Sequence, residues 1–117
     1  MVIQQGDVLW VRFSPPSTSE PAGPRPCVVL QHDRYNATKL STVVVAAITS
    51  NLKYASLPGN VRLGKGEAGL PKPSVVNITQ VWAIDRTRID AKLGRLTDAR
   101  IHEIWSGLRG LLEPMGQ

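Results

Sequence analysis

One arginine is placed where its side chain could bind a phosphate. Arg25 lies between Pro24 and Pro26, at the point where a long loop meets an apolar run. Proline fixes its own φ angle and restricts the preceding residue to extended backbone, so the Arg25 backbone is stiff. A guanidinium held in this way is a good bidentate phosphate ligand, although an arginine in a loop can also serve only solubility. Arg25 is therefore the first candidate for chemistry.

Hydroxyl and imidazole groups supply the other candidates. Thr49 and Ser50 directly follow the apolar run 43–48. The ends of strands are where polar groups reach clefts, but the same pair can simply terminate a strand. His32 ends a predicted strand beside a polar loop, which makes it a candidate site residue. His102 falls on a helix flank, and we expect it to be a surface residue.

The usual motifs for metal or nucleotide chemistry are missing from the sequence. It has no HExxH, no paired CxxC, no GxxxxGK[ST] and no cluster of Asp and Glu suited to two metal ions. Cys27 is the single cysteine and lies in an apolar run, so an internal disulfide is excluded and a core position is expected. We therefore predict no metal site and no cofactor.

The charge of the chain favours a polyanionic partner. The 117 residues carry a formal net charge of +5, with a pI near 9.9. A positive surplus attracts nucleic acid over long range, but charge alone does not identify a ligand. The length predicts one domain over residues 1–117. With no signal peptide and no apolar run long enough to span a membrane, we expect a cytoplasmic protein.

The elements that must position these residues are mostly short strands. Apolar and β-branched runs, separated by loops rich in Gly and Pro, are typical of a strongly bent antiparallel sheet. Of the three tryptophans, which could stack bases, we expect all to be in the core. The predicted strands cover 8–13, 26–32, 42–49, 61–63, 74–84 and 91–96; the tryptophans are Trp10, Trp82 and Trp105.

The end of the chain predicts one helix. Its apolar residues recur at helical spacing from Ile101 to Leu112. Thr97 is the expected N-cap, and Pro114 stops the helix. Two glycines, Gly107 and Gly110, lie off the apolar stripe, and each costs about 1 kcal/mol relative to alanine, so tertiary packing must hold this helix. The predicted fold class is mainly β with a C-terminal α-helix.

Taken in order along nearly the whole chain, these segments resemble the MazF/PemK family of toxin endoribonucleases. The resemblance implies a small SH3-like, CcdB-like antiparallel β-barrel plus helix, and a homodimer. It also implies sequence-specific, metal-independent cleavage of single-stranded RNA by the toxin of a toxin–antitoxin pair, restrained by a cognate antitoxin. The resemblance rests on GDVLW (6–10), SE (19–20), GPRPCVVL (23–30), Asp33 to Asn36, VVVAAITS (43–50), SVVNITQVWAIDRTRI (74–89) and LGRL (93–96).

The family's functional residues can be carried over position by position. The essential arginine and threonine fall on Arg25 and Thr49, and the glutamate of the first loop falls on Glu20. Where members usually read G-S-E-Q, this chain reads Thr18-Ser19-Glu20-Pro21, which predicts a stiffer loop. The expected RNA-binding residues are Ser19, His32, Ser50, Ser74 and Gln80.

The implied reaction is attack of a ribose 2′-OH on the adjacent phosphate, leaving 2′,3′-cyclic phosphate and 5′-OH ends. Arg25 fits the stabilisation of the charged phosphorane, and Thr49 fits orientation of the phosphate. A guanidinium is an awkward base because it stays protonated. Glu20 is a candidate base if its loop folds inward, and the sequence leaves the identity of the base open.

Two alternatives use the same fold class without cleavage. A CcdB-type gyrase-binding toxin ends in Trp-Gly-Ile, whereas this chain ends Glu113-Pro114-Met115-Gly116-Gln117. A non-catalytic RNA- or protein-binding barrel would need little more than the basic charge. RNA cleavage in the presence of a chelator distinguishes the endoribonuclease from both.

Overall fold

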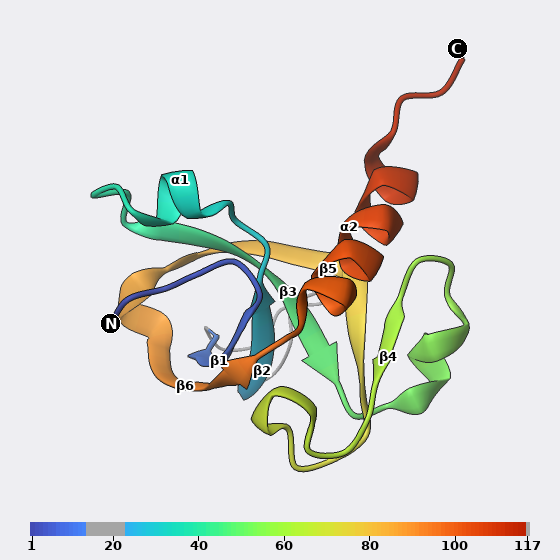
Figure 1. The fold of residues 1–117 in the computed structure, drawn as a ribbon, viewed down its shortest axis with the longest axis horizontal. Helices are drawn as coiled ribbons and strands as arrows, with labels where there is room; N and C mark the ends of the chain where they lie inside the picture. The colour runs from blue at the N-terminus through green and yellow to red at the C-terminus, as the bar shows by residue number, and fades with distance from the viewer. Residues whose placement is uncertain (14–22, 117) are drawn as a thin grey trace.

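A six-stranded antiparallel sheet forms the body of the protein (Figure 1). The computed structural model describes residues 1–13 and 23–116; Ser19 and Glu20 therefore lie outside the described residues. The strand order across the sheet is β4-β5-β3-β2-β1-β6. The strands are β1 (Asp7–Arg12), β2 (Pro24–Val29), β3 (Thr42–Thr49), β4 (Val61–Leu63), β5 (Ser74–Asp85) and β6 (Ile89–Arg95).

Alternating apolar residues give this sheet two buried faces. In β2, Val28 packs into one core cluster, while its neighbours Cys27 and Val29 pack into the other. In β3, Ala46 and Val45 divide between the two clusters in the same way. Because successive side chains of a strand point to opposite faces, continuous apolar runs of this kind suit strands buried on both sides. The burial predicted for residues 42–49 is confirmed for most of that strand.

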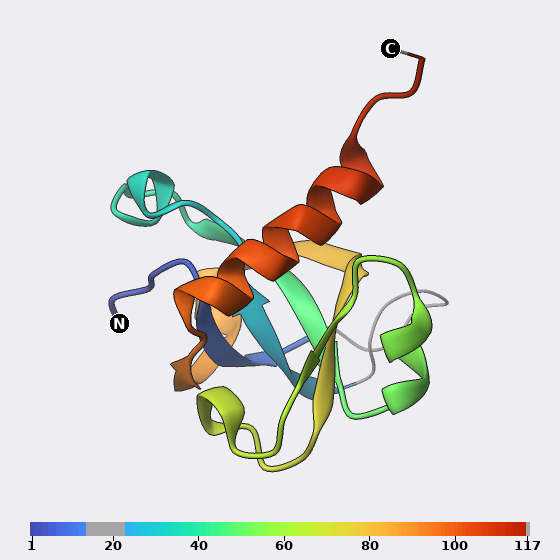
Figure 2. The same cartoon turned by 45° about the vertical axis from the view of Figure 1, so that its right-hand side comes forward.

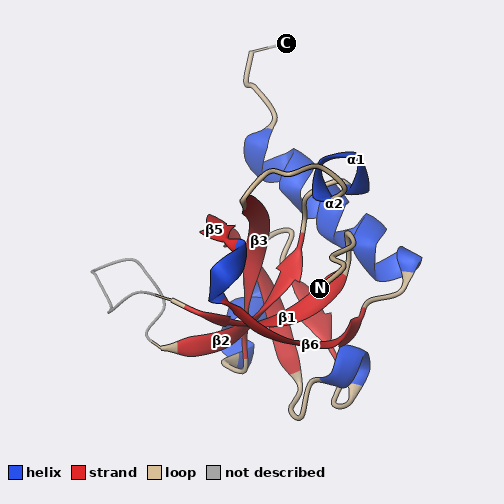
Figure 3. Cartoon of the chain, turned by 90° about the vertical axis from the view of Figure 1, so that its left-hand side faces the viewer, coloured by secondary structure: helices blue, strands red, loops and turns tan. Residues whose placement is uncertain are grey.

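The helix α2 (Asp98–Leu112) lies across one face of the sheet, as Figures 2 and 3 show from two directions. Its N-cap is the predicted Thr97, whose hydroxyl accepts a hydrogen bond of 3.3 Å from the Arg100 backbone N–H. Ile104 and Leu108 are buried against the sheet. The predicted position of this helix is confirmed, and Ile104 and Leu108 are the buried part of its predicted apolar face.

The expectation that all three tryptophans are core residues is wrong. Trp105 is 57% exposed and Trp10 is 36% exposed, while Trp82 is half-buried. Trp105 belongs to the apolar stripe of α2, but the buried residues of this helix are Ile104 and Leu108. The far end of the helix, at Leu112, is 69% exposed.

The predicted strand boundaries shift by a few residues, and one predicted loop contains a helix. Within the polar stretch after β2, a single helical turn, α1 (Asp33–Asn36), forms because the His32 Nδ1 caps it by accepting a hydrogen bond of 2.9 Å from the Arg34 backbone N–H. The strand predicted over 26–32 begins and ends earlier, as β2. Three short 3₁₀ turns, η1 (Leu52–Ser56), η2 (Glu67–Gly69) and η3 (Arg86–Arg88), connect later strands.

The predicted fold class is confirmed: mainly β, antiparallel, with a C-terminal helix. The sheet curls into a half-barrel, and α2 covers part of one face (Figures 1 and 2). Within the described part of the chain, no helix is long and apolar enough to cross a membrane.

Candidate active site

A pocket of about 270 Å³ opens at one end of β2 and β3. It collects Arg25, Thr49, Ser50 and Ser74, four of the residues that the sequence nominated, together with Lys72. The floor and walls are apolar: Trp10, Pro26, Ile48, Leu70, Pro71 and Leu93.

The pairing of β2 with β3 explains why Arg25 and Thr49 share this pocket. The two strands are antiparallel, with Cys27 opposite Ala47. Continuing that register by two residues places Arg25 opposite Thr49, at the shared end of the strands. Arg25 and Thr49 are far apart in the sequence, but the pairing of the two strands brings them to the same end of the sheet.

The hydroxyl groups of the pocket differ in what they can offer a ligand. The Thr49 Oγ1 accepts a hydrogen bond of 3.1 Å from the Asn51 backbone N–H, which leaves its own proton available to donate. The buried Ser74 hydroxyl donates to the Lys72 carbonyl at 2.9 Å and can still accept. Thr49 is thus the better hydrogen-bond donor to an anion.

Positive charge dominates the pocket. Within residues 1–13 and 23–116, no residue that lines the pocket is acidic and no ion pair neutralises Arg25. Its Nε is buried and has no hydrogen-bond partner among the described groups. Arg25 as a whole is only half-buried and lines the pocket, so its guanidinium can donate to an incoming acceptor. A phosphate oxygen is the acceptor that a guanidinium matches best.

The other predicted RNA-binding residues lie elsewhere in the chain. His32 is exposed beyond the opposite end of β2, where it caps α1 and lines a groove beside α2 instead of the Arg25 pocket. Gln80 lies in β5, where the register with β3 jumps between Asn77 and Val81. Ser19 and Glu20 are outside the described residues, so the candidate base has no placement here.

Sequence reasoning missed Lys72, and it also missed a buried polar network beside the irregular part of β5. The buried Asn77 accepts hydrogen bonds from the Thr79 hydroxyl at 2.6 Å and from the Asn60 amide at 3.3 Å. Asn60 in turn accepts one from the Ile78 backbone N–H at 3.0 Å. These contacts satisfy the backbone where the β3 ladder is interrupted, so the polar residues of this strand serve its shape. For Lys72 a signal was present, since it also lies between two prolines.

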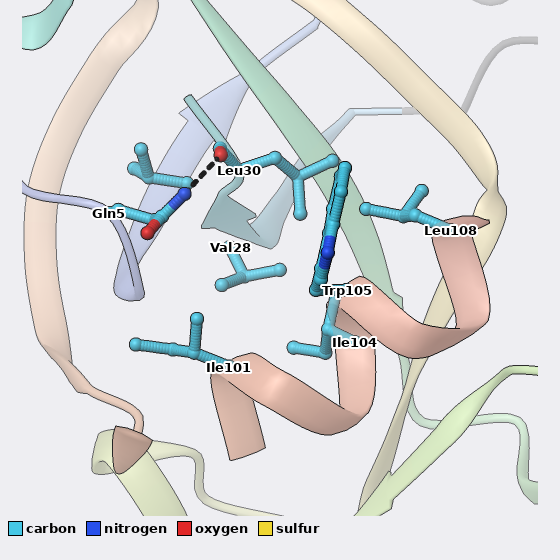
Figure 4. Close-up of a pocket in the computed structure, with 8 residues that line it drawn as sticks. Gln5, Val28, Leu30, Ile101, Ile104, Trp105 and Leu108 are labelled. Atoms are coloured by element: carbon cyan, nitrogen blue, oxygen red, sulfur yellow. Dashed lines mark hydrogen bonds between the residues drawn. The ribbon is translucent and has the colours of Figure 1, made fainter. Parts of the chain in front are cut away.

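An apolar groove lies between α2 and the strands, away from the Arg25 pocket. It has a volume of about 540 Å³, and two histidines, His32 and His102, lie on its border. Figure 4 shows a smaller pocket that shares residues with this groove, where the Trp105 indole lies between Leu30 and Leu108 in that view. The groove residues are Gln5, Leu30, Gln31, Val44, Val81, Ile101, Trp105, Leu108 and Leu112.

The described residues include no cluster suited to a metal ion and no reactive thiol. In the described ranges, no group of three or more His, Cys, Asp or Glu side chains is placed to hold a metal ion. Cys27 is buried, as expected, and burial raises the pKa of its thiol to about 12. A thiol that stays protonated is a poor nucleophile.

The chain has a clear family. Residues 4–112 match the family described as the PemK-like, MazF-like toxin of type II toxin–antitoxin systems. The endoribonuclease MazF6 of Mycobacterium tuberculosis is 42% identical over 113 residues, which cover 97% of this chain and 99% of the relative. This protein therefore belongs to the PemK-like, MazF-like toxin family.

Solved structures agree with this assignment. MazF from Deinococcus radiodurans superimposes with a TM-score of 0.79 at 27% identity, covering 97% of this chain and 99% of that one. A mycobacterial endoribonuclease in complex with its cognate antitoxin has a TM-score of 0.71 at 17% identity, covering 99% and 98%. The second likeness supports the fold alone.

Proposed function

We propose that this protein is an endoribonuclease toxin that cuts single-stranded RNA at a defined sequence, with the Arg25 pocket as its active site. One observation carries the assignment: a guanidinium without an acidic partner among the described residues shares a pocket with the free hydroxyl donor of Thr49. The full-length likeness to MazF6, an endoribonuclease, supports the same activity. The enzyme acts as a single domain, over residues 1–117, in the cytoplasm.

The reaction is an in-line transesterification. The ribose 2′-oxygen forms a bond to phosphorus, the bond from phosphorus to the 5′-oxygen breaks, and 2′,3′-cyclic phosphate and 5′-OH ends remain. Arg25 donates hydrogen bonds to the phosphorane oxygens, whose charge grows in the transition state. Thr49 donates to a further oxygen and orients the phosphate. One proton leaves the 2′-OH for a base, for which Glu20 is the candidate, and one reaches the 5′-oxygen from an acid, for which the Arg25 guanidinium is the candidate.

The residues of the pocket favour cleavage without a metal ion. Mg²⁺ prefers carboxylate and carbonyl oxygens, whereas the described polar side chains that line this pocket are hydroxyl, guanidinium and ammonium groups. A fixed Arg25 supplies positive charge that a metal would otherwise bring. The proposed enzyme therefore needs no cofactor.

The decisive experiment incubates the pure protein with a long RNA in excess EDTA and maps the new 5′ ends. We expect discrete cuts at a recurring short sequence, with 5′-OH ends that polynucleotide kinase labels without prior phosphatase treatment. A folded Arg25→Ala variant is the matched control and should leave the RNA intact. Cleavage that appears only with added Mg²⁺, or no cleavage at all, would contradict the proposal.

The protein acts as a homodimer with an antitoxin partner. The exposed Trp105 and Leu112 leave α2 with an uncovered apolar face, and a second copy is the occupant that the family resemblance implies. The basic pocket suits an antitoxin segment with acidic and apolar residues, which would exclude RNA. Expression of the toxin alone should arrest growth.

Sedimentation tests the dimer, with Trp105→Glu as the variant that should yield monomers and a folded Lys39→Glu as the control, since Lys39 is exposed on a loop and does not line the groove. Competition tests the antitoxin: RNA with a 2′-O-methyl group at the cut site should be displaced from the toxin. Simultaneous binding of that RNA and the antitoxin at one Arg25 pocket would contradict this part of the proposal.

A further inference from the structure

We propose that Lys72 is a second phosphate-binding residue of the pocket, gripping an RNA phosphate beside the one that Arg25 and Thr49 hold. This inference rests on the proposed function and extends it. Lys72 lines the same pocket of about 270 Å³ as Arg25, but it comes from a different part of the chain, just before β5. An RNA strand that enters the pocket therefore meets two cations.

Strand order sets the relation between the two cations. β3, which ends at Thr49, lies between β2 and β5 in the sheet. Arg25 belongs to β2, and Lys72 lies two residues before the start of β5. Two strand spacings amount to roughly 10 Å between backbones, a gap that the two long side chains can narrow. Thr49 thus lies on the strand between the two cations, so one RNA strand that crosses the pocket can bring successive phosphates to them.

The sequence holds Lys72 in the same way as it holds Arg25. Lys72 lies between Pro71 and Pro73, as Arg25 lies between Pro24 and Pro26. The following proline disfavours helical backbone at Lys72, and its carbonyl accepts the Ser74 hydroxyl at 2.9 Å. A lysine with a fixed backbone loses less entropy on binding than one on a free loop. The backbone that carries each cation of the pocket is therefore restricted by prolines on both sides.

The segment before Lys72 is docked at several points. The Glu67 carboxylate accepts hydrogen bonds from the Arg100 guanidinium of α2 at 2.7 and 3.1 Å, and from the Gly64 backbone N–H at 2.9 Å. Gly69, with φ at +78°, packs so closely on Leu93 of β6 that a side chain there would collide with the Leu93 carbonyl group. These contacts with α2 and β6 fix the position of the segment that leads to Lys72.

The charge of Lys72 is available to a ligand. Within the part of the chain that the structure describes, Lys72 forms no ion pair, whereas Lys92 pairs with Asp7 at 3.0 Å. Among the described residues, none that lines the pocket is acidic. Lys39 serves as the control. It is exposed, as Lys72 is, but it lies in the loop at the far end of β3 and does not line this pocket.

The test measures binding of an RNA with a 2′-O-methyl group at the mapped cut site, over a range of salt concentrations. Lys72→Ala should weaken binding about threefold to tenfold at low salt and reduce the slope of log affinity against log salt by about 0.7, the value for one phosphate contact on a single strand. Lys72→Arg should restore both quantities. Lys39→Ala should leave both unchanged.

Cleavage kinetics separate this inference from the proposed function. If the wild-type protein cuts RNA while a folded Lys72→Ala variant keeps the wild-type affinity and salt slope, the inference is overturned and the proposed function stands. If the wild-type protein neither cuts nor binds RNA, both are overturned. With cleavage intact, the expected result is a higher KM for Lys72→Ala with a smaller change in kcat, because a neighbouring phosphate is held equally in the ground and transition states.

Discussion

Gly59 and Gly107 pack backbone to backbone where α2 crosses the turn before β4. A Cβ atom on Gly107 would overlap the Gly59 carbonyl group and lie 2.9 Å from the Gly59 Cα. Gly59 itself has φ at +84°, a conformation that side chains rarely adopt. Gly107, which is unfavourable by helix propensity alone, is therefore a contact point between α2 and the turn before β4.

The two glycines of α2 should respond oppositely to alanine. Gly107→Ala should destabilise the protein by about 1 to 3 kcal/mol, because the methyl group meets backbone atoms that cannot move easily. Gly110→Ala is the matched control: nothing lies within 4 Å of its Cβ position, so helix propensity should stabilise by about 0.5 to 1 kcal/mol. Urea unfolding measures both. Equal effects of the two substitutions would contradict the packing described.

Arg25 should be essential to cleavage and dispensable to folding. Arg25→Ala should lower kcat about 100- to 1,000-fold, the usual cost of losing one donor to a developing oxyanion. Arg25→Lys should recover little, because it keeps the charge and loses the planar fork. Thermal unfolding should stay near wild type for both variants. Wild-type cleavage by a folded Arg25→Ala protein would remove the pocket from consideration.

The Glu67–Arg100 pair should make stability depend on acid pH. The hydrogen bonds from Arg100 lower the pKa of Glu67 below its ordinary 4.5. The folded state thus favours the carboxylate, and the stabilisation is present above pH 4.5 and disappears as the pH falls through the lowered pKa. Glu67→Gln should cost about 1 kcal/mol at pH 7 and almost nothing near pH 2, by urea unfolding.

A second carboxylate provides the control for this prediction. Glu113 lies 3.9 Å from Arg109 at the exposed end of α2. Glu113→Gln should change stability by less than about 0.5 kcal/mol at either pH, as for most surface pairs. A loss for Glu67→Gln that is the same at pH 7 and pH 2 would show that the charge of the carboxylate is not responsible.

The Cys27 thiol should be inert in the native protein. Its burial raises its pKa to about 12, so the reactive thiolate is scarce at pH 8. Modification by a disulfide reagent such as DTNB should proceed only as fast as the protein opens, and denaturant should accelerate it sharply. Rapid labelling of the folded protein would mean that β2 opens readily at the strand that carries Arg25.

Local pattern determined most of the elements of this fold. Runs of apolar and β-branched residues mark the strands and the recurrence of Ile104 and Leu108 marks α2, because both signals depend only on neighbours along the chain. The Thr97 cap could be read for the same reason. The single turn α1 was not predicted, because four residues are too few to show helical periodicity. Its formation depends on the N-cap at His32.

The nomination of the site came from a different kind of information. The proline brackets around Arg25 indicate a stiff cation, but nothing in the linear sequence joins it to Thr49, 24 positions later. That link came from the family resemblance, and the pairing of β2 with β3 supplies the physical cause. Lys72 also lies between two prolines, but the sequence does not indicate that it belongs to the site, because only the order of strands in the sheet brings its loop to the pocket.

Residue types and spacing alone determined that this chain forms a mainly β domain with a terminal helix, a net positive charge and a stiffly held arginine. Only the tertiary structure decided which polar groups share a pocket, that Trp105 stays exposed, and that Gly107 is a contact. Each of those depends on strand register or on how much of α2 the sheet can cover. These are relations between segments far apart in the chain, and local propensity carries no record of them.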